Sequence, residues 1–183
     1  MKIFVMGASG SGTSTLGRGL SRRLNLLHAD SDDFYWEETD PPFTIPRAPE
    51  QLHERFYNFV KAQNFVLSGD VLNWGLPERD VLDAFSHVIF IYVPWEEREQ
   101  RLRQREHRRY GARIMQGGDM HETFENFIEW SKHYDSGLFP GRNKKSQSEF
   151  VMKFRKNGGM GLEINGRLSA EELLNEVFMQ IKK

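Results

Sequence analysis

The chain of 183 residues carries 25 lysines and arginines against 26 aspartates and glutamates, so its charge predicts no general attraction to nucleic acid or to an anionic membrane. It has no cysteine, which excludes disulfide bonds and thiolate zinc sites and is typical of a reducing compartment. No apolar run reaches the ~18 residues of a membrane-spanning helix, and the N-terminus leads into a core strand without a signal-peptide pattern. We expect a single cytoplasmic domain over residues 1–183.

The first elements in chain order are a strand at residues 2–6, a glycine-rich turn at residues 7–12 and a helix that begins at Thr13. This arrangement directs backbone N–H groups and a helix N-terminus toward one point, which favours an anion. The spacing matches a P-loop (Walker A, G-x4-G-K-[ST]), except that Thr13 replaces the lysine. Ser14 would offer its hydroxyl to Mg²⁺. The expected nucleotide-binding residues are Gly7, Ser9, Gly10, Ser11, Gly12, Thr13, Ser14 and Thr15.

The rest of the chain alternates predicted strands with amphipathic helices. Strands are expected at 26–29, 65–69, 87–93 and 162–165, and helices at 16–24, 50–61, 95–110, about 120–128, about 146–156 and after the capping box at 169–172. The strand at 26–29 ends in an acidic turn at 30–33. This alternation predicts an α/β fold with a parallel sheet and a ligand site at the carboxyl ends of its strands. Segments 34–63 and 105–157 are longer than a helical crossover requires, so we expect them to cover substrates.

The glycine turn also admits a second interpretation, a dinucleotide site. Its glycines resemble that fingerprint, Asp30 lies near the place of a ribose-binding acid, and Tyr57-x-x-x-Lys61 resembles the catalytic pair of short-chain dehydrogenases. However, Thr15 replaces the last glycine of the fingerprint, and the Tyr–Lys pair falls too early in the chain. Hydroxyl residues directly after Gly12 are predicted only by a P-loop, so phosphate binding is favoured over an NAD(P)-binding oxidoreductase.

The loop, the acidic turn, Ser68-Gly69-Asp70 and the arginine-rich helix occur in an order that resembles the small P-loop kinases of the nucleoside-monophosphate-kinase-like group, including adenylate, shikimate and gluconate kinases. The resemblance implies a three-layer α/β/α fold with a five-stranded sheet ordered 2-3-1-4-5. It also implies an acceptor-binding region at 34–63 and a lid with helical insertion at about 105–157. The implied function is ATP- and Mg²⁺-dependent phosphoryl transfer to a nucleotide or another small molecule. A nucleotide-binding protein or weak NTP hydrolase is the alternative.

Resemblance to shikimate-type kinases implies roles for the residues that follow two strands. Asp30 would have the metal-side role, and Asp32 would have the acceptor-side role, in which it orients or deprotonates the acceptor hydroxyl. Asp70 is a second metal-side candidate, although the apolar run of a Walker B strand does not precede it directly. The acceptor-binding candidates are Asp33, Arg47, Gly69 and Trp74.

The missing loop lysine is the main departure from the pattern. A unit charge at ~4 Å is worth about 4 kcal/mol at an effective dielectric constant of about 20, so its loss would cost up to about three decades in rate. The arginines at 98, 101, 105, 108 and 109 share one face of a helix. We therefore hypothesise that Arg101 and Arg105 supply the catalytic charge that Thr13 does not.

Overall fold

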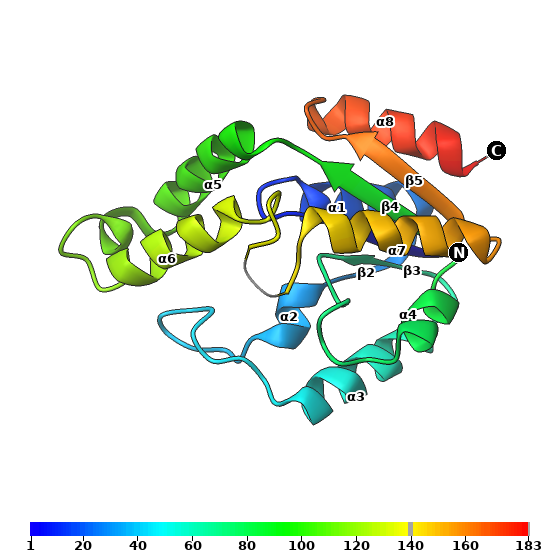
Figure 1. Cartoon of the computed structure of the whole chain (residues 1–183), viewed down its shortest axis with the longest axis horizontal. Coiled ribbons are helices and arrows are strands. Elements are labelled where there is room, and N and C mark those ends of the chain that lie inside the picture. Colours follow the sequence, from blue (N-terminus) through cyan, green and yellow to red (C-terminus); the bar gives the residue numbers. More distant parts are fainter. Residues whose placement is uncertain (139–140, 183) are drawn as a thin grey trace.

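The computed structural model describes residues 1–138 and 141–182. Its centre is a parallel five-stranded sheet in the order β2-β3-β1-β4-β5, which confirms the expected fold class and strand order (Figure 1). The strands are β1 (Lys2–Gly7), β2 (Leu27–Asp30), β3 (Phe65–Ser68), β4 (His87–Tyr92) and β5 (Met160–Asn165).

Helices cover both faces of the sheet, as the alternating pattern predicted. They are α1 (Thr13–Leu24), α2 (Ser31–Tyr35), α3 (Pro49–Val60), α4 (Glu78–Ala84), α5 (Trp95–Tyr110), the 3₁₀ helix η1 (Gly111–Ile114), α6 (His121–Lys132), α7 (Lys144–Lys156) and α8 (Ala170–Ile181). No helix within the described ranges combines the length and the hydrophobicity that crossing a membrane requires.

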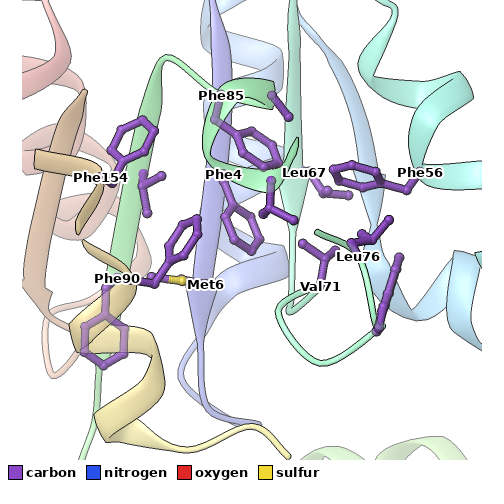
Figure 2. Packing of buried hydrophobic residues seen from close by; sticks show 14 of the residues in the cluster. Phe4, Met6, Phe56, Leu67, Val71, Leu76, Phe85, Phe90 and Phe154 are labelled. Carbon is purple, nitrogen blue, oxygen red and sulfur yellow. The ribbon is translucent and has the colours of Figure 1, made fainter. Parts of the chain in front are cut away.

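Alternate residues of β1 enter two different cores, because successive side chains of a strand point to opposite faces. Phe4 and Met6 pack with residues of α3, α4 and α7 on one face, as Figure 2 shows for this cluster. Ile3 and Val5 pack with α1 and α8 on the other face. Both faces of the central strand are therefore covered, which explains why its sequence is apolar without a polar side.

The order of the strands decides between the two interpretations of the glycine turn. In the dinucleotide-binding order, 3-2-1-4-5-6, β2 lies beside β1. Here β3 pairs with β1 from Lys2↔Phe65 to Val5↔Ser68, and β2 pairs with the far side of β3. The Tyr57 hydroxyl donates to Asp80 Oδ2 of α4 at 2.5 Å, and Lys61 Nζ donates to Asn58 of α3 at 2.9 Å, so both side chains of this pair have structural partners. The observed strand order therefore contradicts the dinucleotide-binding fold that the oxidoreductase alternative requires.

The segment at 105–157 divides into two parts with different surroundings. The end of α5, η1 and α6 form a small core of their own around Leu102, Ile114 and Ile128, and they project beyond the sheet in Figure 1. Helix α7, in contrast, packs on the sheet, where Phe150, Val151 and Phe154 join the main core. The last part of the expected lid is therefore a structural layer of the domain.

Candidate nucleotide and phosphoryl-transfer site

The glycine turn connects β1 to α1 at the carboxyl edge of the sheet. Gly12 has φ +96° and is the N-cap residue of α1, a conformation that suits glycine, and no side chain among the described residues caps the helix. The first-turn N–H groups of α1 consequently lack intrahelical acceptors. A Cβ at Gly7 would lie 2.6 Å from both the Ile91 carbonyl and Ser11 Oγ, so only glycine fits this tight turn.

Two further observations fit an anion at this turn. Ser11 is buried, and its Oγ has no hydrogen-bond partner among the described residues, which leaves a polar group to be satisfied. The turn also packs under α5, because a Cβ at Gly10 would lie 3.0 Å from the Arg98 carbonyl oxygen and 3.0 Å from Leu102 Cγ. The start of α5 therefore covers the turn while the amides of α1 stay uncapped.

Ser14 and Asp30 meet at the end of β2. The Ser14 hydroxyl donates a short hydrogen bond to Asp30 Oδ2, and Asp30 Oδ1 accepts the Asp32 N–H at 3.2 Å. The Asp33 carboxylate accepts the Asp30 N–H at 3.4 Å, so a reciprocal capping box begins α2. The sequence interpretation treated residues 30–33 as a turn, whereas they start a five-residue helix. One carboxylate thus links the phosphate loop to the acidic segment.

Asp32 has an unusual electrostatic environment. Its residue surface is accessible to solvent, yet the surrounding protein desolvates the carboxylate enough to raise its pKa, and the neighbouring Asp30 raises that pKa further. Arg142 and Arg105 oppose the shift with their positive charges. A raised pKa on a carboxylate that is influenced by both carboxylates and guanidinium groups is typical of a proton-transfer residue.

Asp70 follows β3 and has partners for both of its oxygens. Gln147 Nε2 donates to Oδ1 at 2.9 Å, and Asn73 Nδ2 donates to Oδ2 at 3.2 Å. The Tyr134 hydroxyl in turn donates to Gln147 Oε1 at 2.6 Å, and burial raises the pKa of Tyr134. The sequence did not indicate this network, which joins Asp70 to α7 rather than to Ser14 and Asp30.

The arginines of α5 have separate environments, although they share one helical face in sequence. Arg98 is fully buried, and it donates to the Val93 and Ser131 carbonyl oxygens and to Asp135 Oδ2 at 2.8 Å. Arg101 donates to the Gly166 carbonyl at 3.1 Å. Arg105 Nε donates to Glu106 Oε1 at 2.5 Å. Arg105, one of the two hypothesised catalytic arginines, also opposes the raised pKa of Asp32 with its positive charge.

A residue that sequence reasoning missed contacts the phosphate loop. Arg142 Nη2 donates to Ser9 Oγ at 2.6 Å, and its guanidinium carbon lies 5.3 Å from the Trp130 ring centre. No motif surrounds this arginine; the only sequence signal is its position directly before Asn143, the N-cap residue of α7.

The four acceptor-side candidates lie on or beside α2. Gly69 has φ +110°, and a Cβ there would come 1.9 Å from Ser31 Oγ, so it allows the ends of β3 and α2 to meet. Trp74 is 7% exposed and packs with Phe34 at 6.4 Å between ring centres. Asp33 belongs to the capping box. Arg47 pairs with Glu37, and its buried Nε has no partner among the described residues.

Comparison with known proteins shows the family. A family model described as an AAA domain, AAA_18, matches residues 3–126. The Bacillus subtilis (strain 168) protein "Uncharacterized protein YqaC" is 38% identical over 143 residues, which are 78% of this chain and 77% of that protein. The chain belongs to this AAA domain family. Its loop and strand order make it a P-loop NTPase of the nucleoside-monophosphate-kinase-like group, as the sequence resemblance implied.

Kinases are among the more distant relatives of this P-loop NTPase. Shikimate kinase 2 of Sodalis glossinidius (strain morsitans) is 26% identical over 108 residues, 55% of this chain and 62% of that protein. The solved structure of shikimate kinase from Bacteroides thetaiotaomicron superposes with a TM-score of 0.56 at 16% identity, covering 100% of this chain and 99% of that one. At this level of identity the structural match shows a shared P-loop kinase fold.

Proposed function

We propose that the protein transfers the terminal phosphoryl group of ATP, bound with Mg²⁺, to a hydroxyl group of a small molecule. The observation that carries the proposal is the hydrogen bond from Ser14 to Asp30, directly beside the uncapped start of α1 and two residues before Asp32. The phosphate loop after β1 and the two carboxylates after β2 then lie at the same edge of the sheet, joined by the Ser14–Asp30 hydrogen bond. The kinase names of two relatives support the same reaction class.

The donors at this edge fit Mg²⁺. Ser14 Oγ and the Asp30 carboxylate are hard oxygen ligands, and among the described residues no group of three histidines or acids could hold a metal alone. Mg²⁺ usually takes one or two protein ligands and completes its shell with phosphate oxygens and water. When bound, it would neutralise charge on the phosphates. Asp70 is less suited to this role, because its carboxylate has Gln147 and Asn73 as hydrogen-bond partners, whereas the Asp30 carboxylate contacts Ser14.

Asp32 is the residue that we assign to the acceptor. Its ionised form accepts the proton of the acceptor hydroxyl, and its raised pKa brings its basicity closer to neutral pH. We also assign Arg47, Asp33, Gly69 and Trp74, which lie on or beside α2, to the acceptor side. Arg47 Nε offers a donor that the described residues leave unpaired.

A transfer assay against a library of phosphate acceptors tests the proposal. Wild-type protein with ATP and Mg²⁺ should phosphorylate at least one hydroxyl compound, and thermal stabilisation by ATP should require Mg²⁺ for its full extent. Ser14→Ala should lower both the phosphoryl transfer and the thermal stabilisation by ATP. The matched control is Ser136→Ala, which removes an exposed hydroxyl that donates to the His133 carbonyl oxygen. Stabilisation by NAD(P) alone would contradict the assignment.

Thr13 favours a second candidate, a nucleotide-binding protein or weak hydrolase. The lysine of the P-loop pattern is absent, while the amides that would bind phosphate depend only on the backbone. ATP binding with slow release of inorganic phosphate, and no transfer to any acceptor tested, would identify this second function.

A further inference from the structure

The phosphate loop lacks its own cation, so the surrounding structure must supply one if phosphate charge is to be balanced. Arg142 reaches the loop from a position 133 residues later in the chain, with a 2.6 Å hydrogen bond from Nη2 to Ser9 Oγ. Ser9 lies inside the glycine turn, four residues before Thr13. The guanidinium group therefore lies beside the amides that would hold phosphate oxygens.

The charge of Arg142 is not neutralised by a neighbouring acid. Within the described ranges, no carboxylate lies within ion-pair distance of its guanidinium, whereas Arg105 pairs with Glu106 at 2.5 Å and Arg98 pairs with Asp135 at 2.8 Å. Arg142 therefore brings to the phosphate loop a positive charge that no acid in the described part of the chain pairs with.

The local backbone holds Arg142 in this place. Gly141 has φ +105°, and the Asn143 side chain caps α7 by accepting the Ser146 N–H at 2.9 Å. Helix α7 packs on the sheet through Phe150 and Phe154, so the segment starts from a fixed element. The guanidinium carbon also lies over the ring of Trp130 of α6, 5.3 Å from its centre, a cation–π contact that uses none of the N–H donors of the guanidinium.

We propose that Arg142 binds the polyphosphate and replaces the cation that Thr13 cannot provide. The inference rests on the proposed function for its ligand, a nucleoside triphosphate. Ser9 Oγ holds the guanidinium beside the loop in the described structure, and phosphate oxygens are stronger acceptors for the same N–H groups because they are charged. Arg142 replaces Arg101 and Arg105 as the main source of this charge.

Calorimetric binding with no acceptor present tests the inference without relying on turnover. The probes are ATP with Mg²⁺, inorganic tripolyphosphate, which carries the charge without a base, and adenosine, which carries the base without charge. Arg142→Ala should weaken binding of ATP and tripolyphosphate about 10- to 100-fold and leave adenosine unchanged. Arg142→Lys should keep most of the affinity. The control Arg155→Ala removes an arginine at the other end of α7, which pairs with Glu163.

A compensating variant adds a second test. Thr13→Lys in the Arg142→Ala background should recover most of the lost tripolyphosphate affinity, because it returns a cation to the loop, and melting temperatures show whether each variant is folded. Equal affinities of wild type and Arg142→Ala would overturn the inference and leave the proposed function standing. An Arg142→Lys variant as weak as Arg142→Ala would also overturn it, since charge would not be the cause. Wild-type protein that binds neither ATP nor tripolyphosphate would contradict the proposed function itself.

Discussion

Helix α5 contains the densest arginine sequence of the chain, whereas the residue before the N-cap of α7 is a single arginine without a motif. The arginines of α5 are largely engaged: Arg98 is buried on Asp135, Arg105 contacts Glu106, and Arg103 bridges Glu99 and Glu125. Arg142 instead donates to a neutral hydroxyl of the phosphate loop. The difference teaches that the partners of a charged side chain, more than the local density of charge, decide whether it is available to a ligand.

Arg105 of α5 and Arg142 both oppose the raised pKa of Asp32, and the substitution of Asp32 gives the largest expected effect. Asp32→Asn keeps the size of the side chain and removes its basicity, so transfer to the acceptor should fall about 10²- to 10⁴-fold while ATP affinity changes little. A steady-state assay beside ATP calorimetry measures both. Unchanged turnover would exclude Asp32 as the base.

The same variant makes a prediction about stability. Since the folded protein raises the pKa of Asp32 above its ordinary value, ionisation of Asp32 disfavours the folded state at neutral pH. Asp32→Asn should therefore melt at a higher temperature than wild type near pH 7, and the difference should shrink as pH falls toward 4. A lower melting temperature at neutral pH would contradict the pKa shift.

Arg98→Ala tests the opposite side of the comparison. The change leaves Asp135 and two carbonyl oxygens without their buried donor, so the free energy of unfolding should fall by about 3–5 kcal/mol. Urea denaturation followed by circular dichroism measures this loss. Arg103→Ala on the exposed side of α5 is the control, with an expected loss of about 1 kcal/mol or less.

Gln147→Leu tests whether α7 belongs to the domain core. The variant leaves Asp70 Oδ1 and the Tyr134 hydroxyl without their amide partner, and a stability loss of about 1–3 kcal/mol is expected. If α7 moved freely as part of a lid, denaturant unfolding would change little.

The smallest expected effect is a shift in the pH dependence of the rate, which compares the influence of Arg142 and Arg105 on Asp32. Removing a positive charge destabilises the carboxylate and raises its pKa, so the acidic limb of the rate profile should move to higher pH in Arg142→Ala and in Arg105→Ala. The shift should be larger for Arg142→Ala, because Arg142 opposes the raised pKa more than Arg105 does. A larger shift of the acidic limb in Arg105→Ala would indicate that Arg105 of α5, and not Arg142, is the main positive charge acting on Asp32.

Sequence patterns were sufficient for the sheet and the phosphate loop, because strand alternation and glycine spacing are local properties. They did not predict α2, since five residues are too few to show a helical period. They also did not predict that α7 packs on the sheet, because the apolar face of a helix does not show which part of the protein it contacts. Arg142 meets Ser9 across 133 residues, and a contact of that kind has no local signature. The family model ends at residue 126, before this arginine.

Helix α5 covers the phosphate loop, because Gly10 lies in close contact with Arg98 and Leu102 of this helix. Since a Cβ at Gly10 would lie only 3.0 Å from the Arg98 carbonyl oxygen, we expect a displacement of α5 to displace the loop as well. Under the proposed function, buried Arg98 would act indirectly, because its ion pair with Asp135 holds α5 in place over the loop. Loss of the Arg98–Asp135 ion pair would then alter the room that α5 leaves for phosphate groups at the loop.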